Sequence, residues 1–193
     1  MLPEFLVKRL NEEYGEKLTL KIIEGYSKKR PTTFRINTIK SSREKIEQEL
    51  KAKEINFERY DTILNSYIVK DEKIKIDELD IYKNGEIYVQ SLSSMLPPII
   101  LNPQEKTDIL DMTAAPGGKT TQIAALTNNC ANITACEMNN VRLERLKYNI
   151  EKQGAKSVYI MKTDSRKIDK LFAFDQSNGV STVELYRIIG VYG

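Results

Sequence analysis

The chain has 193 residues, of which 40% are hydrophobic and 30% charged, and its net charge is +3. This is the composition of a soluble globular protein with a core, and no apolar run approaches the roughly 20 residues that a membrane-spanning helix requires. The absence of histidine excludes histidine-based acid–base catalysis and most zinc-binding schemes, so we predict no metal site. The N-terminus lacks the zones of a signal peptide, which leads us to expect a cytoplasmic protein.

The first thirty residues are predicted to form two helices. Apolar residues at helical spacing indicate helices over 3–14 and 16–26, separated at Gly15. Three basic residues follow at 28–30. They could form a solvated helix end or contact RNA phosphates, and the sequence leaves both interpretations open.

From residue 32 the pattern changes to short strands around one helix. Phe34 and Ile36 alternate with polar residues, which predicts a half-buried strand. Ser41 and Glu44 form a predicted capping box at the start of a helix. Further strands are predicted at 56–60, 64–69 and 86–89. Together these segments indicate a compact α+β unit that ends near residue 90.

The most informative stretch begins with the apolar run 109–112 and passes through Pro-Gly-Gly at 116–118 into helix-forming residues. A buried strand, a glycine turn and a helix point backbone N–H groups at an anionic ligand group. Asp111 stands at the strand end, where open parallel sheets contact their ligands. A P-loop would need a glycine in place of Thr113, and a dinucleotide fingerprint would need three spaced glycines. Either a ligand approaches this backbone closely or the segment is an ordinary βα turn.

Two acidic residues follow later strands of the same predicted sheet. Glu137 ends the predicted strand 133–137, about twenty residues past the glycines, where a Rossmann-type site places an acid for ribose hydroxyls. The alternative is a carboxylate that caps the next helix, predicted over 139–153. A third strand at 157–161 leads to Asp164.

The stretch 111–121, Asp-Met-Thr-Ala-Ala-Pro-Gly-Gly-Lys-Thr-Thr, resembles the first S-adenosylmethionine-binding motif of the Sun-type (Nol/Nop/Sun) RNA cytosine-5 methyltransferases. That family reads Asp-x-Cys-Ala-Ala-Pro-Gly-Gly-Lys, so Thr113 replaces a usual cysteine that is not the nucleophile. The resemblance runs from about Leu2 to about Asp175. It implies an α/β protein with a small α+β RNA-recognition-like module at 1–92, an incomplete Rossmann-like methyltransferase domain at 93–175 and an atypical tail at 176–193.

The resemblance also implies the cofactor S-adenosyl-L-methionine. Its carboxylate would meet the glycine turn, its ribose Glu137 and its adenine amine Asp164, with Arg142 close to the acid and the cofactor. A surface ion pair with Glu137 or Glu144 is the alternative for Arg142. The residues predicted at the turn are Asp111, Thr113, Ala114, Ala115, Pro116, Gly117, Gly118 and Lys119.

The implied partner is ribosomal or transfer RNA. In the α+β module the candidate contacts are Arg35, Asn37, Tyr60 and Tyr67, each with a solvated sheet face as the alternative. The segment 90–98 resembles the family's entry into the cofactor domain, and we expect a short helix beside the cofactor pocket.

The resemblance stops within the predicted fourth strand, 171–175. In the family this strand runs into Asp-Ala-Pro-Cys, and a later Thr-Cys supplies a thiolate that adds at cytosine carbon 6 and makes carbon 5 reactive. Neither motif is present here, so we predict no catalytic residue in this chain. Cys130 and Cys136 lack both contexts, and we expect buried structural thiols.

Three functions remain open at this point. The chain could be a catalytically incomplete RNA cytosine-5 methyltransferase, a non-catalytic remnant that binds RNA or the cofactor, or a subunit that a partner chain completes. A half-sheet leaves an edge strand exposed, so we also expect self-association through that edge.

Overall fold

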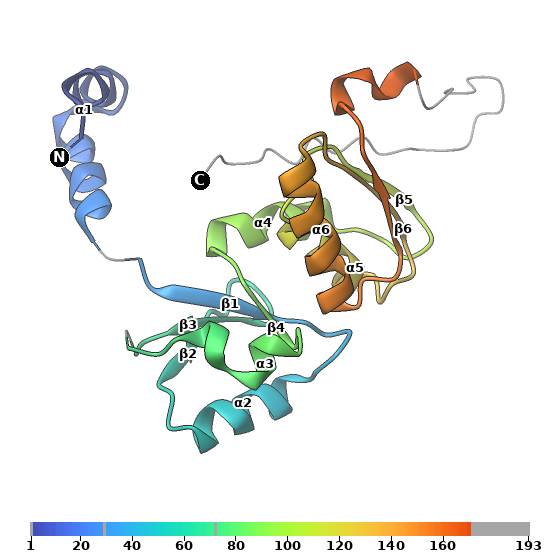
Figure 1. Cartoon of the computed structure of the whole chain (residues 1–193). Helices are drawn as coiled ribbons and strands as arrows, with labels where there is room; N and C mark the ends of the chain where they lie inside the picture. Colours follow the sequence, from blue (N-terminus) through green and yellow to red (C-terminus); the bar gives the residue numbers. More distant parts are fainter. Residues whose placement is uncertain (1, 29, 72, 171–193) are drawn as a thin grey trace. The chain divides into compact units, whose positions relative to one another are not determined.

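The computed structural model describes residues 2–28, 30–71 and 73–170, and the chain divides into two compact units, Met1–Pro31 and Thr32–Gly193 (Figure 1). The first unit contains α1 (Glu4–Ser27), which is interrupted at Gly15 with φ 75° and ψ 163°. Glycine adopts this left-handed φ without a steric penalty, so the two predicted helices and their boundary are confirmed. The predicted fourth strand, 171–175, and the tail lie outside the described residues.

The second unit begins with a small antiparallel sheet covered by helices (Figure 1). Its strand order is β2-β3-β1-β4, and its chain order of strand, helix, two strands, helix and strand is the ferredoxin-like arrangement. The predicted RNA-recognition-like α+β module is therefore confirmed as a fold. Its elements are β1 (Thr32–Ile36), α2 (Arg43–Ala52), β2 (Phe57–Arg59), β3 (Ser66–Val69), η1 (Ile76–Glu78), α3 (Asp80–Lys83) and β4 (Ile87–Val89).

One face of this sheet carries an apolar core. Phe34 and Tyr67 are paired across β1 and β3, and their rings stack at 5.2 Å between centroids. Ile46 and Leu50 of α2 are fully buried against this face. The helix begins one residue later than predicted, because Ser42 rather than Ser41 accepts the capping hydrogen bond from the backbone N–H of Lys45. Ser41 instead donates a hydrogen bond to Glu86 Oε2 at 2.9 Å.

The opposite face is also buried, which contradicts the prediction of a half-buried strand. Arg35 and Asn37 of this face are 3% and 0% exposed. Asn37 Nδ2 donates to the carbonyl oxygens of Gly85 (2.8 Å) and Gln153 (2.7 Å), the second of which belongs to the following module. The alternation of polar and apolar residues in this strand therefore does not indicate a solvated face. It marks a junction between two modules, because the hydrogen-bond partners of its polar residues lie far along the chain.

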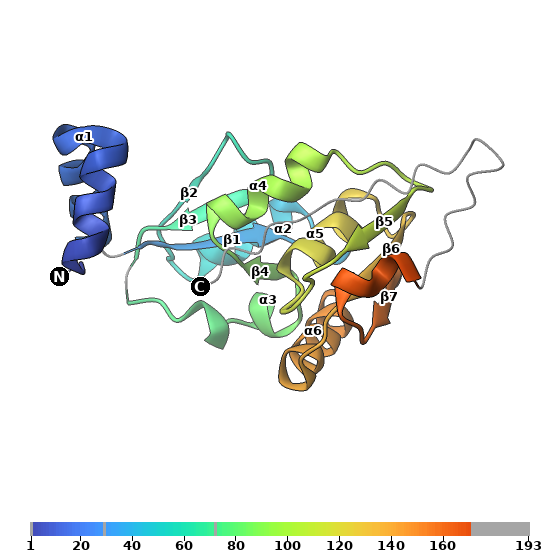
Figure 2. The same ribbon diagram turned by 90° about the horizontal axis from the view of Figure 1, so that it is seen from above.

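The following module is a three-stranded parallel sheet with helices packed on it (Figure 2). The strand order is β5-β6-β7, and β5–β6 and β6–β7 both pair in parallel. In both views α5 lies between this sheet and the antiparallel one (Figures 1 and 2). The elements are α4 (Leu92–Leu101), β5 (Asp108–Asp111), α5 (Gly118–Leu126), β6 (Asn132–Cys136), α6 (Asn140–Gln153), β7 (Val158–Met161) and η2 (Ser165–Lys170).

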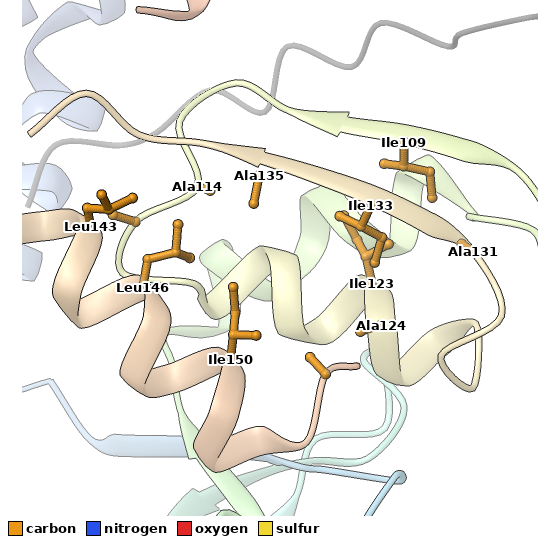
Figure 3. Packing of buried hydrophobic residues seen from close by; sticks show 12 residues of the cluster. Ile109, Ala114, Ile123, Ala124, Ala131, Ile133, Ala135, Leu143, Leu146 and Ile150 are labelled. Carbon is orange, nitrogen blue, oxygen red and sulfur yellow. The ribbon is translucent and has the colours of Figure 1, made fainter. Parts of the chain in front are cut away.

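The parallel sheet buries one face under α5 and α6. Figure 3 shows Leu146 and Ile150 of α6 and Ile123 of α5 directed toward Ile133 and Ala135 of β6. All the predicted elements over 90–161 are present, and α6 ends at Gly154 in the left-handed conformation, as the sequence predicts. Among the described residues, no helix combines the length and apolar character needed to cross a membrane.

Candidate functional site

The carboxyl end of β5 leads directly into the glycine turn. Asp111 is only 1% exposed, and both of its carboxylate oxygens bind the turn. Oδ1 accepts the backbone N–H of Thr113 at 3.2 Å, and Oδ2 accepts the Thr120 hydroxyl at 2.6 Å. Burial raises the pKa of the Asp111 carboxyl, although these hydrogen bonds oppose the shift. Asp111 thus joins the strand end to the first turn of α5, and its direct contact with a ligand stays a prediction.

The turn itself depends on Gly117. This residue has φ 106°, and its N–H donates to the carbonyl of Ala114 at 2.7 Å. A β-branched side chain is unfavourable at this φ, and a Cβ atom would also meet Leu146 Cδ1 at 3.1 Å. Gly118 already belongs to α5, and a Cβ atom there would meet Tyr88 Cε1 at 3.2 Å. The backbone conformation that requires glycine therefore lies at Gly117, one residue before the second glycine.

The remaining turn residues differ in their exposure. Ala114 and Ala115 are buried beneath the turn, whereas Thr113 and Pro116 are exposed and Lys119 is partly exposed. The first N–H groups of an α-helix have no partners within the helix, so those at the start of α5 can bind an anionic group next to this turn.

Glu137 follows β6, the next strand of the sheet, and is 8% exposed. Its Oε1 accepts the backbone N–H groups of Met138 and Asn139, both at 2.9 Å. The cap of α6 is Asn139, whose side chain accepts the N–H of Arg142. Glu137 therefore holds the loop before α6 without being its N-cap, and a carboxylate with about four acceptor positions keeps room at Oε2 for a ribose hydroxyl.

Arg142 connects this acid to the glycine turn. Its Nε lies 3.3 Å from Glu137 Oε2, and its Nη2 donates to the carbonyl of Ala115 at 2.9 Å. Of the two alternative acids, Glu144 pairs instead with Lys147 at 2.8 Å. The pair between Arg142 and Glu137 agrees with both the resemblance and the surface-pair alternative, and a contact of Arg142 with the cofactor stays a prediction.

Asp164 lies beyond β7, at the same edge of the sheet. The backbone N–H of Glu137 donates to the carbonyl of Met161 at 3.2 Å, which brings the ends of β6 and β7 together. The guanidinium of Arg166 binds the Asp164 carboxylate at 2.7 and 2.9 Å and lowers the pKa of Asp164 to about 2. Asp164 is thus an ionised acceptor that is paired with Arg166, whose side chain is 81% exposed.

One residue of this site was missed from the sequence. Asn149 Nδ2 donates to the carbonyl of Pro116 at 2.8 Å. It lies seven residues after Arg142 on α6, which places both side chains on the same helix face. The spacing from Arg142 could have identified it once that helix was assigned to the site.

The two cysteines have different environments. Cys136, the last residue of β6, is fully buried beside Leu110, and burial raises the pKa of its thiol to about 11. Cys130 is exposed, so the prediction that it is buried is wrong. It lies in the turn before β6, outside the strand pairing, where no sheet covers it. Among the described residues, no group of three or more acidic or cysteine side chains could hold a metal ion.

The burial of side chains in the ferredoxin-like module tests the predicted RNA contacts. Arg35, Asn37 and Tyr67 are buried, so neither an RNA contact nor a solvated face describes them. Tyr60 is partly exposed. Lys28 forms an exposed ion pair with Glu24 at 2.7 Å, which fits the solvated helix end and leaves an RNA contact untested.

Comparisons with known proteins agree with the arrangement of the two modules. The family model described as 16S rRNA methyltransferase RsmB/F matches residues 98–177, and the model for the ferredoxin-like domain of RsmF/B-like methyltransferases matches residues 2–72.

Two curated relatives and one solved structure illustrate the similarity. The 25S rRNA (cytosine-C(5))-methyltransferase nop2 of Schizosaccharomyces pombe is 33% identical over 164 residues, which cover 84% of this chain and 27% of that protein. The tRNA (cytosine(72)-C(5))-methyltransferase of Pyrococcus horikoshii is 41% identical over 96 residues, covering 50% and 25%. A crystal structure of a methyltransferase homolog protein from Pyrococcus horikoshii superposes with a TM-score of 0.81 at 30% identity, covering 88% of this chain and 55% of that one.

The chain thus spans about a quarter of the length of these two curated relatives. The ferredoxin-like and parallel-sheet modules follow each other in the order that the two family models require. The Rossmann-like architecture that the family resemblance implies is confirmed by the superposition. The chain belongs to the RsmB/F family of RNA cytosine-5 methyltransferases, of which it contains the ferredoxin-like module and the first parallel strands of the methyltransferase domain.

Proposed function

We propose that this chain provides the RNA-facing module and the S-adenosyl-L-methionine-binding strands of an RNA cytosine-5 methyltransferase that acts on ribosomal or transfer RNA. One observation carries the proposal. The glycine turn, the Glu137–Arg142 pair and Asp164 come from three consecutive parallel strands, and they meet at the carboxyl edge of the sheet. Ligands bind at this edge in open α/β sheets.

The residues at this edge fit the groups of the cofactor. The N–H groups at the start of α5 suit its carboxylate, Glu137 can accept from its ribose hydroxyls, and Asp164 can accept from its adenine amine. Arg142 would keep Glu137 and the turn at a fixed separation through its bonds to both. When bound, S-adenosyl-L-methionine supplies an electrophilic methyl group.

Calorimetric titration with S-adenosylhomocysteine tests the site. We expect Glu137→Ala to weaken binding by about 1.5–3 kcal/mol, the usual contribution of a hydrogen bond to a charged group. Glu137→Gln keeps an oxygen for the N–H groups of Met138 and Asn139 and should show a smaller loss. Glu144→Gln is the matched control, because it removes an acid of α6 that pairs with the exposed Lys147. Equal affinity of Glu137→Ala and the parent chain would reject the ribose assignment.

We further propose that the chain alone does not methylate RNA. Cytosine carbon 5 needs a thiolate that adds at carbon 6, and neither cysteine suits that role. The thiol of Cys136 is buried with a pKa of about 11, and Cys130 precedes β6, whereas the site follows that strand. The assay is transfer of tritiated methyl groups to total RNA, with Cys130→Ser and Cys136→Ser alongside. Incorporation that disappears in one variant would identify that cysteine as the nucleophile.

Self-association through the sheet edge stays a prediction. Within the described residues, β5 pairs only with β6, so its other edge is free to take a strand from outside that range. Sedimentation velocity across a range of concentrations tests it, and a monomer throughout would reject it.

A further inference from the structure

Arg35 is a buried cation of the ferredoxin-like module whose hydrogen bonds cross to the methyltransferase module. The residue is 3% exposed. Its Nη2 donates to the carbonyl of Gly118 at 3.1 Å and to the Thr121 hydroxyl at 2.8 Å, and its Nε donates to Gln90 Oε1 at 3.1 Å. The guanidinium thus ends on the first turn of α5, directly behind the glycine turn.

The charge of Arg35 is not neutralised by an acid. Among the described residues, no carboxylate forms an ion pair with it, and its Nη1 is buried without a hydrogen-bond partner. The ring of Tyr88 lies 5.1 Å from its Cζ, which provides a cation–π contact. Burial lowers the pKa of Arg35 to about 10, so the side chain keeps its charge at neutral pH. Burying a cation without a counter-ion destabilises a fold. A bound anion close to Arg35 would offset this destabilisation.

The contacts around Arg35 hold the glycine turn from the side of the ferredoxin-like module. Thr121, which accepts the Arg35 hydrogen bond, donates its own hydroxyl to the carbonyl of Gly117 at 2.6 Å. Gln90 Nε2 donates to the carbonyl of Ser94 at 2.8 Å, so the Arg35 anchor is itself held by α4. Space behind Gly118 is limited by Tyr88, which a Cβ atom would meet at 3.2 Å. The backbone of the turn is therefore supported by the ferredoxin-like module in addition to the contacts within its own module.

We propose that Arg35 is a positioning residue for the cofactor turn, through which the ferredoxin-like module raises the affinity of the methyltransferase module for the anionic end of the cofactor. The identity of this ligand rests on the proposed function. The support fixes the carbonyls of Gly117 and Gly118 and with them the N–H groups of the turn. The positive charge behind the helix start adds to the potential that favours an anion there. Binding and support are then coupled, since an anion at the turn compensates the buried charge of Arg35.

The experiment compares Arg35→Met with Lys40→Met in the full chain. Lys40 is a matched control because it also donates across the junction, to the carbonyl of Lys152 at 2.6 Å, but does not contact the turn. We expect Arg35→Met to bind S-adenosylhomocysteine about tenfold more weakly, Arg35→Lys to recover part of this loss and Lys40→Met to match the parent. Amide hydrogen exchange at Gly118–Gln122 should accelerate in Arg35→Met alone.

Two further outcomes decide the proposal where the first variant is uninformative. If Arg35→Met does not melt cooperatively, Thr121→Val replaces it, because it removes the hydroxyl between Arg35 and Gly117 with little change in volume. If the parent binds no S-adenosylhomocysteine, the proposed function fails, and exchange at Gly118–Gln122 alone decides whether Arg35 supports the turn. Parent-like affinity and parent-like exchange in Arg35→Met or its replacement would overturn the proposal.

Discussion

The two faces of the antiparallel sheet bury charge in opposite ways. On the α2 side, the Glu47 carboxylate receives both Nε and Nη2 of Arg59 at 2.6 Å and the Tyr67 hydroxyl at 2.7 Å. On the other side, Arg35 has uncharged partners only, among the residues described. The first face pairs its buried charge within one module, whereas the buried charge of the second has no acidic partner and hydrogen-bonds to the next module. The comparison indicates that one face of the sheet stabilises the ferredoxin-like module, whereas the other joins this module to the glycine turn.

The largest expected effect tests the face that stabilises the module. Phe34→Ala removes a fully buried ring that stacks on Tyr67, and it should lower the free energy of unfolding by about 3–5 kcal/mol. Urea denaturation followed by circular dichroism measures the change. Leu64→Ala, at a side chain 71% exposed, is the control and should leave stability almost unchanged. A loss below about 1 kcal/mol for Phe34→Ala would contradict the assignment of this face as the core.

A smaller effect is expected at the joining face. Asn37→Ala leaves the carbonyls of Gly85 and Gln153 without their buried donor, which should cost about 2 kcal/mol. Because these carbonyls lie in different modules, the variant should also unfold in a broader transition than the parent. Asn37→Asp, which has the same shape but cannot donate as a carboxylate, should be at least as destabilising. A parent-like midpoint and slope in both variants would show that the junction does not depend on Asn37.

The smallest expected effect is a pH-dependent loss of stability when the buried carboxylate of Glu47 is removed. The hydrogen bonds from Arg59 lower the pKa of Glu47 to about 2, against an ordinary value of 4.5. A folded-state pKa below the unfolded one gives stability above pH 4.5 that is lost as the pH falls toward 2. Glu47→Gln should therefore cost about 1.5 kcal/mol at pH 7 and much less at pH 2.

Glu58→Gln is the control for this pH dependence. Glu58 pairs with Lys70 on the same sheet, but both side chains are about half exposed, at 56% and 46%. Exposed pairs contribute little, so this change should stay within about 0.5 kcal/mol at every pH. Equal pH profiles for the parent chain and Glu47→Gln would show that Arg59 does not hold the Glu47 carboxylate.

Periodicity and turn residues predicted most of the architecture. Gly15 separates the two N-terminal helices, and Gly154 ends α6, because glycine takes a left-handed φ that other residues avoid. The predicted strands of the parallel sheet are correct because each is a short, mainly apolar run bounded by turns or helices, and β5 and β6 are largely buried. The short η1 and α3 are not predicted from the sequence, since elements of three or four residues carry no periodic signal.

The local arrangement of the proposed cofactor site was also predictable from the sequence alone. The order of strand, glycine turn and helix, with Glu137 and Asp164 after the next two strands, requires only that parallel strands end at one edge. This determines which residues meet, because the three strands run in the same direction and their carboxyl ends lie side by side. The contacts of Asp111 with Thr113 and Thr120 follow from the same few residues.

Only the tertiary structure decided what lies behind that site. Arg35 precedes Gly118 by 83 residues, and nothing in its own strand distinguishes a polar residue that faces water from one that faces another module. Both satisfy the same alternation, since the pattern reports which residues avoid the apolar core and not what covers the other face. The partner of Arg35 is chosen by the packing of two modules, a long-range contact that local sequence does not encode.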